Sequence, residues 1–396
     1  MNNEPQIILR RGKEESLLRY HPWIFSGAIY GVIGDDPKEG QLVTVLDSER
    51  NFAARGHFQH GSIAVRILTF ENEAIDVAWW EGRIASACRL RRALGLVDNP
   101  STTCYRLIHG EGDSLPGLVI DIYGRIAVMQ AHSMGMYLAR EEIARAIRAV
   151  CGDAIEAVYD KSSGTLPGQV RTAAIDQYLF GAAVPEPVLE NGKKFLVNWE
   201  RGQKTGFFLD QRDNRALVEH YARGRKVLNT FCYTGGFSVY ALQGGATQVD
   251  SVDSSQRAVE TARENVDLNF GTGALHRAIT ADAFEYLKTI DDGYGMIILD
   301  PPAFAKHHKV LGNALQGYKR LNARAFSQIR PGGILFTFSC SQAVGREQFR
   351  QTIFSAAAIA GRQVRILHQL TQPADHPVSI YHPEGEYLKG LVLYVE

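Results

Sequence analysis

The sequence is poor in cysteine, and the cysteines that it has are scattered. There are five among 396 residues, Cys88, Cys104, Cys151, Cys232 and Cys340, and no two form a Cys-x-x-Cys pair. An odd and dispersed set argues against a disulfide framework and a cysteine-based zinc site, and it is typical of a reducing compartment. We therefore expect free thiols, no metal site and a cytoplasmic protein.

Long apolar runs and an excess of charge of either sign are also absent. No run is long enough to span a bilayer, and the first 30 residues carry charges throughout without the apolar core of a signal peptide. We expect no membrane association. Lysine plus arginine and aspartate plus glutamate both number 43, so the net charge is zero. Overall charge gives no sign of a nucleic-acid partner, and any basic surface has to be local.

The composition that remains is ordinarily globular, with 45% hydrophobic and 22% charged residues. A chain of this length is expected to form two or three domains. We predict an N-terminal domain over residues 1–72, a central domain over 73–183 and a C-terminal domain over 184–396. The stretch 181–187 carries two prolines and no periodicity, which favours a linker there.

The N-terminal part is predicted to be β-rich. Short alternating or apolar runs occur at residues 6–9, 42–46, 52–57 and 64–69, separated by turn residues, and one short helix is predicted over 13–20. A basic cluster surrounds this helix and two aromatic residues follow it: Arg10, Arg11, Lys13, Arg19, His21, Trp23 and Phe25. Such a cluster suits RNA, with charges on phosphates and rings that stack on bases. A solvated face beside two core aromatics is the commoner alternative.

The central part is predicted to be a small α/β module. Its elements are an amphipathic helix over 75–94, a hairpin of strands 118–122 and 126–130, a helix over 137–150 and a strand over 154–159. The first helix adds four arginines to the expected local basic surface: Arg83, Arg89, Arg91 and Arg92.

From residue 195 onward, strands and helices alternate, which indicates a parallel sheet covered on both faces. Strands are predicted at 226–229, 248–252, 275–280, 296–299, 334–338, 363–370 and 388–395. Helices are predicted at 211–221, 236–242, 256–269, 283–289, 314–329 and 346–360. No helix separates the last two strands, so we expect them to pair antiparallel at one edge.

The C-terminal domain is organised around a glycine turn. The apolar strand 226–229 leads into Gly235 and Gly236, and a helix follows. Glycine lets the backbone approach a ligand closely, and open α/β sheets bind ligands at the carboxyl ends of their strands. Asp253 ends the next strand and is placed to accept hydrogen bonds from both ribose hydroxyls of an adenosine. The alternative is a turn that merely joins strand to helix.

Three more strand ends fall on the same edge of the predicted sheet. Asp282 is placed to bind an adenine amino group beside the Ala283 amide, although a helix N-cap is equally open. Asp300 precedes two prolines, which fix the backbone and leave rigid carbonyls that can hold a planar base, or which simply end the strand. Cys340 lies between two serines at a strand tip and could act as a thiolate nucleophile, or pack as a small buried residue.

Segments across the chain resemble one family, the RlmI-type 23S rRNA (cytosine-C5) methyltransferases. In the C-terminal half, residues 204–212, 229–236, 300–302 and 338–341 resemble the family's motifs. Residues 19–27 look like its N-terminal PUA domain, residues 110–117 like its central domain, and residues 375–377 and 383–385 like its C-terminal loop. The resemblance implies an α/β fold with a Rossmann-like class I methyltransferase sheet at the C-terminus, an N-terminal β-rich PUA domain and a small central α/β domain.

The resemblance also implies a function, a cofactor and a set of site residues. It implies an S-adenosylmethionine-dependent enzyme that forms 5-methylcytosine in 23S rRNA, with Cys340 as nucleophile, Asp300 at the target base, and a homodimer left open. The cofactor pocket is expected to use Gln211, Arg212, Asn229, Thr234, Gly235, Gly236, Asp253, Asp282, Ala283 and Asp300. The base that removes the C5 proton stays open between Asp300, Lys204 and a water.

Two departures from the family pattern bear on the target pocket. Related RNA cytosine methyltransferases often carry a second cysteine where this chain has Pro302, and Ala303 stands where a lysine is expected. Product release therefore needs another base. Two other functions stay open: a guanine N7 or N2 methyltransferase, which needs no nucleophilic cysteine, and a non-catalytic RNA-binding protein. A nicotinamide dehydrogenase is disfavoured because the turn lacks Gly-x-Gly-x-x-Gly spacing.

Overall fold

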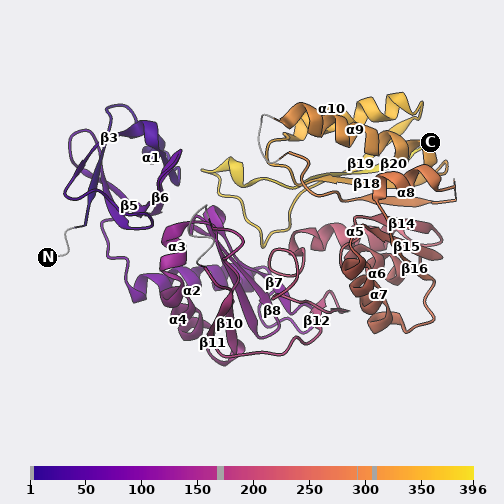
Figure 1. Ribbon diagram of the computed structural model, residues 1–396, viewed down its shortest axis with the longest axis horizontal. Coiled ribbons are helices and arrows are strands. Elements are labelled where there is room, and N and C mark those ends of the chain that lie inside the picture. Colours follow the sequence, from indigo (N-terminus) through magenta and orange to yellow (C-terminus); the bar gives the residue numbers. More distant parts are fainter. Residues whose placement is uncertain (1–3, 167–173, 292, 306–309) are drawn as a thin grey trace. The chain divides into compact units, whose positions relative to one another are not determined.

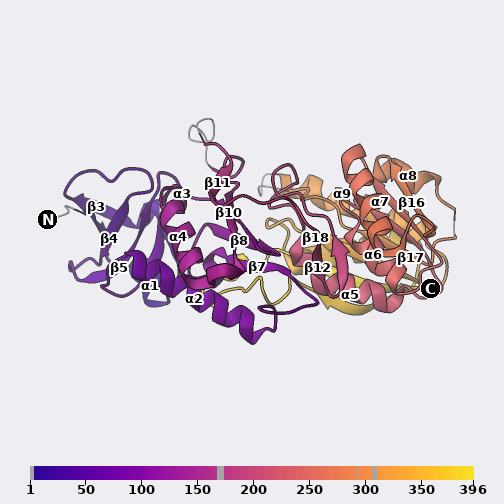
Figure 2. The same ribbon diagram turned by 90° about the horizontal axis from the view of Figure 1, so that it is seen from below.

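The computed structural model describes residues 4–166, 174–291, 293–305 and 310–396. Close backbone contacts divide the chain into two compact units. The first unit contains Met1–Val188, Val197–Phe207 and Ala374–Gly385, and the second contains Leu189–Leu196, Phe208–Pro373 and Glu386–Glu396. The chain therefore passes from one unit to the other several times, and the three-domain division at residues 72/73 and 183/184 stays a prediction. Figures 1 and 2 show the elements along the chain.

The N-terminal part of the first unit is a six-stranded sheet of order β2-β6-β5-β4-β1-β3. Its elements are β1 Gln6–Leu9, α1 Glu15–Leu18, β2 Trp23–Phe25, β3 Ile29–Ile33, β4 Leu42–Leu46, β5 Phe52–Phe58 and β6 Ile63–Thr69. Inward-facing aliphatic residues such as Ile7, Val43 and Val65 form its core. Four strands and the short helix lie where the sequence predicted them. Strands β2 and β3 were missed, because β2 spans only three residues and β3 is mostly solvent-exposed around Gly31.

The central part of the first unit is a five-stranded sheet of order β11-β10-β9-β8-β7. Its elements are α2 Val77–Ala93, β7 Cys104–His109, β8 Leu118–Tyr123, β9 Ile126–Ala131, α3 Met134–Leu138, α4 Arg140–Cys151, β10 Ala157–Asp160 and β11 Gln177–Phe180. The β8–β9 hairpin is confirmed. The single helix predicted over 137–150 is two helices: α3 begins after the N-cap Ser133, and α4 begins at Arg140.

The second unit carries a seven-stranded sheet of order β16-β15-β14-β17-β18-β20-β19. Its strands are β14 Lys226–Thr230, β15 Gln248–Asp253, β16 His276–Thr280, β17 Met296–Leu299, β18 Gly333–Ser339, β19 Val364–Leu370 and β20 Lys389–Val395. The first five are parallel, while β20 runs antiparallel to both β18 and β19. The predicted antiparallel edge is confirmed. A short pair, β12 Val188–Glu190 and β13 Lys193–Phe195, precedes the sheet.

Helices cover both faces of this sheet, as the alternation predicted. They are α5 Arg212–Tyr221, α6 Gly236–Gln243, α7 Gln256–Phe270, α8 Ala283–Thr289, α9 Leu311–Gln328 and α10 Arg346–Ile359. Helices α5, α6 and α7 pack in one layer, and α8, α9 and α10 in the other (Figure 1). Each layer has its own apolar core against the sheet. Among the described residues, no helix is long and apolar enough to cross a membrane.

Strand order fixes where a ligand can bind. The chain runs outward from β14 through β15 to β16, and then returns to the other side of β14 with β17 and β18. The connections on the two sides of β14 diverge, and sheets of this kind bind ligands in a crevice at such a point, here at the carboxyl ends of β14 and β17. Most of the predicted site residues come from the strand ends and loops at that edge, Asn229 lies within β14, and Gln211 and Arg212 come from the start of α5.

Candidate active site

The glycine turn after β14 is built from strained backbone. Phe231, Tyr233 and Gly235 all have positive φ angles, of 55°, 46° and 77°. Gly235 is the N-cap of α6, and a Cβ there would lie 2.9 Å from Cβ of Ala262. Only glycine fits this position without a shift of α7, so the turn holds backbone amides at a helix N-terminus against the crevice.

Asp253 ends β15 beside this turn, as the sequence predicted. Its Oδ2 accepts a hydrogen bond from the Tyr233 amide at 3.0 Å, and its Oδ1 accepts one from the Ser255 amide at 2.9 Å. Both oxygens retain acceptor capacity, since a carboxylate offers about four lone-pair directions. The side chain is half-buried at the edge of the crevice. It therefore fixes the turn and still presents a charge where a ribose diol is expected.

Asp282, which follows β16, acts as a helix N-cap, one of the two roles that the sequence allowed. Its Oδ1 accepts a hydrogen bond from the Glu285 amide at 3.0 Å, so Asp282 is the N-cap of α8. The residue is solvent-exposed, and Ala283 next to it is buried. Capping occupies one oxygen only, which leaves the other available to a ligand.

Three other predicted cofactor residues lie in or next to the turn. Asn229 is fully buried, and its Nδ2 donates to Ser238 Oγ at 2.9 Å, which ties β14 to α6. Thr234 is buried as well, and its Oγ1 has no hydrogen-bond partner among the described residues. Gly236 is packed against a side chain, since a Cβ there would lie 3.1 Å from Cδ of Arg215.

A buried charge network joins the two helices that flank the turn, α5 and α6. Arg215 donates from Nε to Glu190 Oε1 at 2.7 Å and from Nη2 to Oε2 at 2.6 Å, and Tyr240 donates its hydroxyl to Oε1 at 3.0 Å. The predicted Arg212 belongs to this network, with Nε 3.8 Å from Glu190 Oε2. Two arginines and a fully buried carboxylate thus hold α5 against α6.

Gln211 and Asp300 meet at the crevice. Gln211 Nε2 donates to Asp300 Oδ1 at 3.1 Å, and Gln211 Oε1 accepts from Asn214 Nδ2 at 2.6 Å. The amide orientation is thereby fixed, and it fixes the carboxylate in turn. The structure thus joins a predicted cofactor residue to a predicted catalytic residue.

Cys340 lies at the tip of β18, next to the tip of β17. Its Sγ is 4.0 Å from the carbonyl oxygen of Pro301, directly after Asp300. The thiol is partly exposed, while the flanking Ser339 and Ser341 are fully buried. Their hydroxyls share the hydroxyl of Tyr318 at 3.0 Å, which rigidly positions the strand tip.

Sequence reasoning missed Lys389, the first residue of β20. It is buried, and its Nζ donates to the carbonyl oxygens of Ser341 at 2.7 Å and Val344 at 2.6 Å. Burial lowers the pKa of Lys389 to about 8, and the negative charge of a Cys340 thiolate acts in the opposite direction. The sequence feature that could have revealed it is a single lysine at the start of an otherwise apolar strand. The structure thus holds this cation on the backbone of the residue that follows Cys340.

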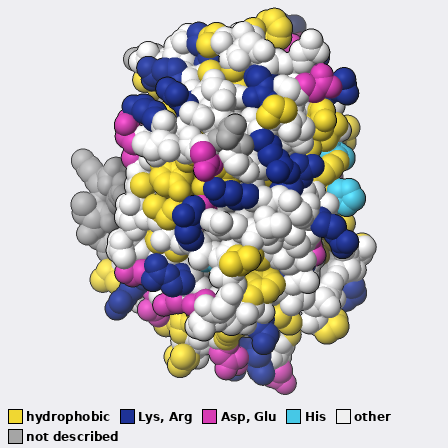
Figure 3. Space-filling view, turned by 90° about the vertical axis from the view of Figure 1, so that its right-hand side faces the viewer, with side chains coloured by type: hydrophobic (Ala, Val, Ile, Leu, Met, Phe, Trp, Pro, Cys, Tyr) yellow, Lys and Arg dark blue, Asp and Glu magenta, His cyan; other side chains and the backbone are white. Residues whose placement is uncertain are grey.

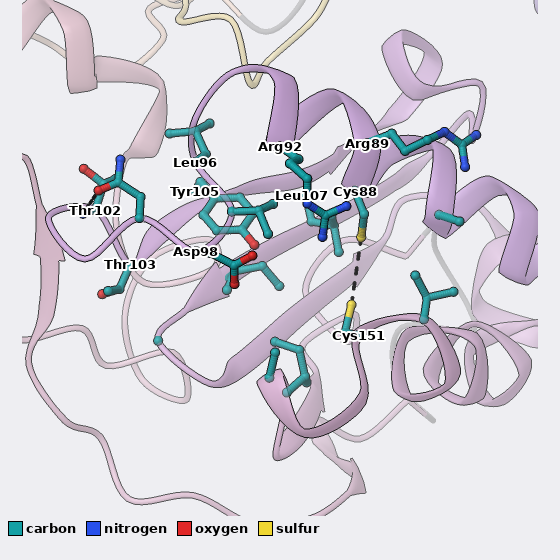
Figure 4. Close-up of a pocket in the computed structure, with 18 of the residues that line it drawn as sticks. Cys88, Arg89, Arg92, Leu96, Asp98, Thr102, Thr103, Tyr105, Leu107 and Cys151 are labelled. Atoms are coloured by element: carbon teal, nitrogen blue, oxygen red, sulfur yellow. Dashed lines mark hydrogen bonds between the residues drawn. The ribbon is translucent and has the colours of Figure 1, made fainter.

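The other cysteines lie away from this arrangement. Burial raises the pKa of Cys232, with Asp253 adding to the effect, so its thiol stays protonated. Cys88 and Cys151 approach to 3.9 Å between sulfurs in a pocket of about 590 Å³ in the first unit (Figure 4). The hydrogen bond from Cys151 is the main effect that lowers the pKa of Cys88. This pair lies on α2 and α4 of the first unit and not at the glycine-turn edge.

The expected basic surface needs one correction. Arg91 is fully buried and pairs with Asp113, and its Nη2 donates to the Asp375 carbonyl at 2.7 Å. It therefore stabilises the fold and cannot contact RNA. Arg89 and Arg92 are exposed, as are Arg10, Arg11, Lys13 and Arg19 of the basic cluster around α1, whereas His21 is partly buried. On the face seen in Figure 3, lysine and arginine side chains are spread among hydrophobic and acidic ones.

Comparison with known proteins gives the family. A family model described as S-adenosylmethionine-dependent methyltransferase matches residues 157–381, and a PUA-like domain matches residues 7–70. Ribosomal RNA large subunit methyltransferase I of Pseudoalteromonas atlantica is 42% identical, with 98% of this chain and 99% of that protein covered. The protein of the same name from Klebsiella pneumoniae (strain 342) is 39% identical, with 99% and 98% covered.

Solved structures agree on the fold. A proposed SAM-dependent methyltransferase from Streptococcus mutans matches with a TM-score of 0.83 at 24% identity, covering 98% of this chain and 99% of that one. A methyltransferase structure complexed with SAH matches with a TM-score of 0.84, also at 24% identity and with the same coverage.

The residues of the turn fit the cofactor that this family uses. Asp253 presents acceptors for a ribose, the Gly235 turn presents backbone amides, and the buried Thr234 hydroxyl has no partner among the described residues. The sequence match with the relatives over nearly the whole chain and the cofactor-compatible residues at the glycine turn lead to one conclusion. The chain belongs to the ribosomal RNA large subunit methyltransferase I family of S-adenosylmethionine-dependent methyltransferases.

Proposed function

We propose that this enzyme methylates C5 of a cytosine in 23S rRNA, with Cys340 as the nucleophile. The observation that carries the proposal is the partly exposed Cys340 thiol 4.0 Å from the Pro301 carbonyl, at the strand tip next to Asp300. The relatives' name supports a large-subunit ribosomal RNA substrate. The exposed basic cluster and the exposed rings of Tyr20 and Phe25 support RNA binding by the PUA-like domain.

The chemistry explains why a cysteine is needed. Cytosine C5 is a poor nucleophile, and addition of the Cys340 thiolate to C6 makes C5 electron-rich, like an enamine carbon. S-adenosylmethionine supplies, when bound, the sulfonium methyl group that C5 accepts. The cytosine has to leave its helical stack to reach the cleft. Asp300, oriented by Gln211, would accept a hydrogen bond from the amino group of the base and, in its protonated form, give a proton to N3, where the negative charge from thiolate addition collects. Loss of the C5 proton to a base and release of Cys340 from C6 complete the reaction.

Lys389 gives the thiolate its counter-charge. An opposite charge nearby favours the ionised form of a cysteine. The ammonium of Lys389 is fixed by two backbone carbonyls of the loop that follows Cys340, so it cannot turn away to solvent. We therefore assign to Lys389 the role of a positioning residue that stabilises the Cys340 thiolate.

The cofactor assignment keeps the predicted residues and divides them by role. Contact with the cofactor is proposed for Gln211, Thr234, Gly235, Gly236, Asp253, Asp282, Ala283 and Asp300. A supporting role is proposed for the buried Asn229 and Arg212, which hold α6 and α5 in place. The proposed enzyme is cytoplasmic and acts as a monomer or a homodimer.

The test compares Cys340→Ser with Cys88→Ser, a partly buried cysteine of the first unit. Nucleoside mass spectrometry after incubation with 23S rRNA should show 5-methylcytosine with wild type and Cys88→Ser, and none with Cys340→Ser. All three should bind S-adenosylhomocysteine equally. RNA that contains 5-fluorocytosine should form a covalent adduct that peptide mapping places on Cys340, since fluorine blocks the final elimination. Full turnover by Cys340→Ser, methylation of guanine, or an adduct on Cys232 would refute the proposal.

A further inference from the structure

Three of the segments that carry the family resemblance meet in the first unit, far along the chain from one another. They are the N-terminal segment 19–27, the central segment 110–117, and the C-terminal segment Ala374–Gly385, which we name the strap. The Pro377 carbonyl of the strap packs directly on Gly112, where any Cβ would clash. The Asp375 side chain accepts a hydrogen bond from the Arg106 amide at 3.0 Å. The strap is thus tied to this unit, and methyl transfer at Cys340 does not account for the junction.

A histidine–carboxylate cluster lies at this junction. His21, His382 and Glu384 present ligand atoms that all lie within 4.8 Å of one another. His21 Nε2 is 3.9 Å from Glu384 Oε1, and His382 Nε2 is 3.8 Å from Glu384 Oε2. Both distances are too long for hydrogen bonds. The three side chains surround a common point without bonding to each other.

His382 shows that something more belongs at this point. Only 3% of the residue is exposed, and both ring nitrogens lack a hydrogen-bond partner among the described residues. A buried polar group without a partner is costly, and a native protein that contains one often binds an ion or a water there. Trp23 closes one side, with its ring centroid 4.3 Å from that of His382, and donates its Nε1–H to Glu111 Oε1 at 2.8 Å.

One tautomer of His21 has the orientation of a metal-bound histidine. Its Nδ1 lies 3.2 Å from both the carbonyl oxygen and the amide nitrogen of Trp23, so it donates to the carbonyl in the Nδ1–H tautomer and accepts from the amide in the Nε2–H tautomer. A metal-ligating histidine commonly donates its other ring N–H to a carbonyl in this way. In the Nδ1–H tautomer, Nε2 carries the lone pair that can bind a metal, and it lies 3.9 Å from Glu384 Oε1.

We propose that His21, His382 and Glu384 form a binding site for a divalent transition-metal ion, best suited to Zn²⁺. Two imidazoles and one carboxylate with an open fourth position are a donor set that zinc accepts at about 2.0–2.2 Å. Tetrahedral bonds of about that length separate ligand atoms by about 3.3–3.5 Å, so each side chain has to move by less than about 1 Å. Bound Zn²⁺ clamps the strap to the PUA-like domain and satisfies the buried His382.

The test uses the full-length protein after removal of metals with a chelator. One equivalent of Zn²⁺ should bind, measured by mass spectrometry of the metal after gel filtration. Glu384→Gln keeps the size of an exposed side chain and so should fold, and His382→Ala removes the buried ring. Each substitution should weaken Zn²⁺ binding by more than about 100-fold. Loss of a residue that only hydrogen-bonds to a metal ligand costs roughly 10–100-fold, and loss of a ligand should cost more. The matched control is His60→Ala: His60 lies 3.9 Å from Glu39 on the surface without a second histidine, and its loss should change nothing.

Cobalt and tryptophan fluorescence identify the site. Bound Co²⁺ should give the visible absorption of a tetrahedral nitrogen–oxygen site without thiolate charge-transfer bands, and it should quench tryptophan fluorescence. Trp23→Phe should retain Co²⁺ binding and lose most of the quenching. Hydrogen exchange in the strap should slow when Zn²⁺ is added. Equal zinc content in wild type and Glu384→Gln, or cobalt bands of thiolate ligands, would overturn the proposal. These readouts do not involve Cys340, so the site and the proposed reaction can fail separately.

Discussion

Replacement of Gly235 by alanine tests whether close approach at the turn governs cofactor binding. A left-handed conformation costs an L-residue about 1–2 kcal/mol, and overpacking of a filled site costs about 1–3 kcal/mol more. At Gly235, φ is +77° and the new Cβ would lie 2.9 Å from Cβ and 3.0 Å from Cα of Ala262. Gly361 is a matched control, because it ends α10 in a left-handed Schellman turn with φ +65° and a Cβ there meets nothing within 4 Å. We expect a loss of about 1–2 kcal/mol at Gly361 and about 2–5 kcal/mol at Gly235.

The two variants should differ more in ligand binding than in stability. Urea unfolding gives the loss of stability, and calorimetry gives the affinity for S-adenosylhomocysteine. Gly235→Ala should shift the turn and displace the Tyr233 amide, from which Asp253 accepts a hydrogen bond. Loss of at least one charge-assisted hydrogen bond should weaken ligand binding by about 1.5–3 kcal/mol, or roughly tenfold or more in affinity. Gly361→Ala should bind the ligand normally. Equal destabilisation of the two variants with unchanged affinity would refute the argument from close approach.

Three further changes probe the groups around the crevice. Asp253→Ala should weaken S-adenosylhomocysteine binding by about 1.5–3 kcal/mol, the scale of a charge-assisted hydrogen bond; unchanged calorimetry would remove the assignment. Glu190→Gln leaves Arg215 buried with a neutral partner, so urea unfolding should show a loss of about 3–5 kcal/mol, and a loss under about 1 kcal/mol would mean that solvent reaches the pair. Lys389→Met should slow the alkylation of Cys340 relative to wild type. The difference in rate should be large below pH 8, where Lys389 is charged, and small above it. A difference in rate that does not change with pH would exclude a role for that charge.

The second unit could be predicted closely from the sequence because several local signals agree there. Strand β17 and helix α8 begin and end at the predicted residues, since a short buried apolar run and an N-capping aspartate mark them. The order of strand ends along the chain also brought Asp253, Asp300 and Cys340 to one edge. These inferences need only the period of the pattern and the rule that parallel strands share a carboxyl edge.

What the sequence could not show depends on contacts between distant segments. Arg91 looks like its exposed neighbours in an arginine-rich helix, and only the fold shows that it pairs with Asp113. Lys389 gains its meaning from the carbonyls of another strand's loop. The candidate metal ligands are a histidine near the N-terminus and two residues near the C-terminus, so no ligand spacing exists to be recognised.

The strap explains why the last two strands are joined by a long connection. Strands β19 and β20 pair antiparallel, and such strands commonly need a loop of only about two to five residues. Here the chain leaves the second unit after Pro373, contributes the strap to the first unit, and returns at Glu386, close before Lys389. A longer loop costs little conformational entropy, whereas its contacts with Arg91, Gly112 and the histidine cluster are specific. The strap is therefore a part of the first unit, and changes there should alter RNA or metal binding and leave cofactor affinity intact.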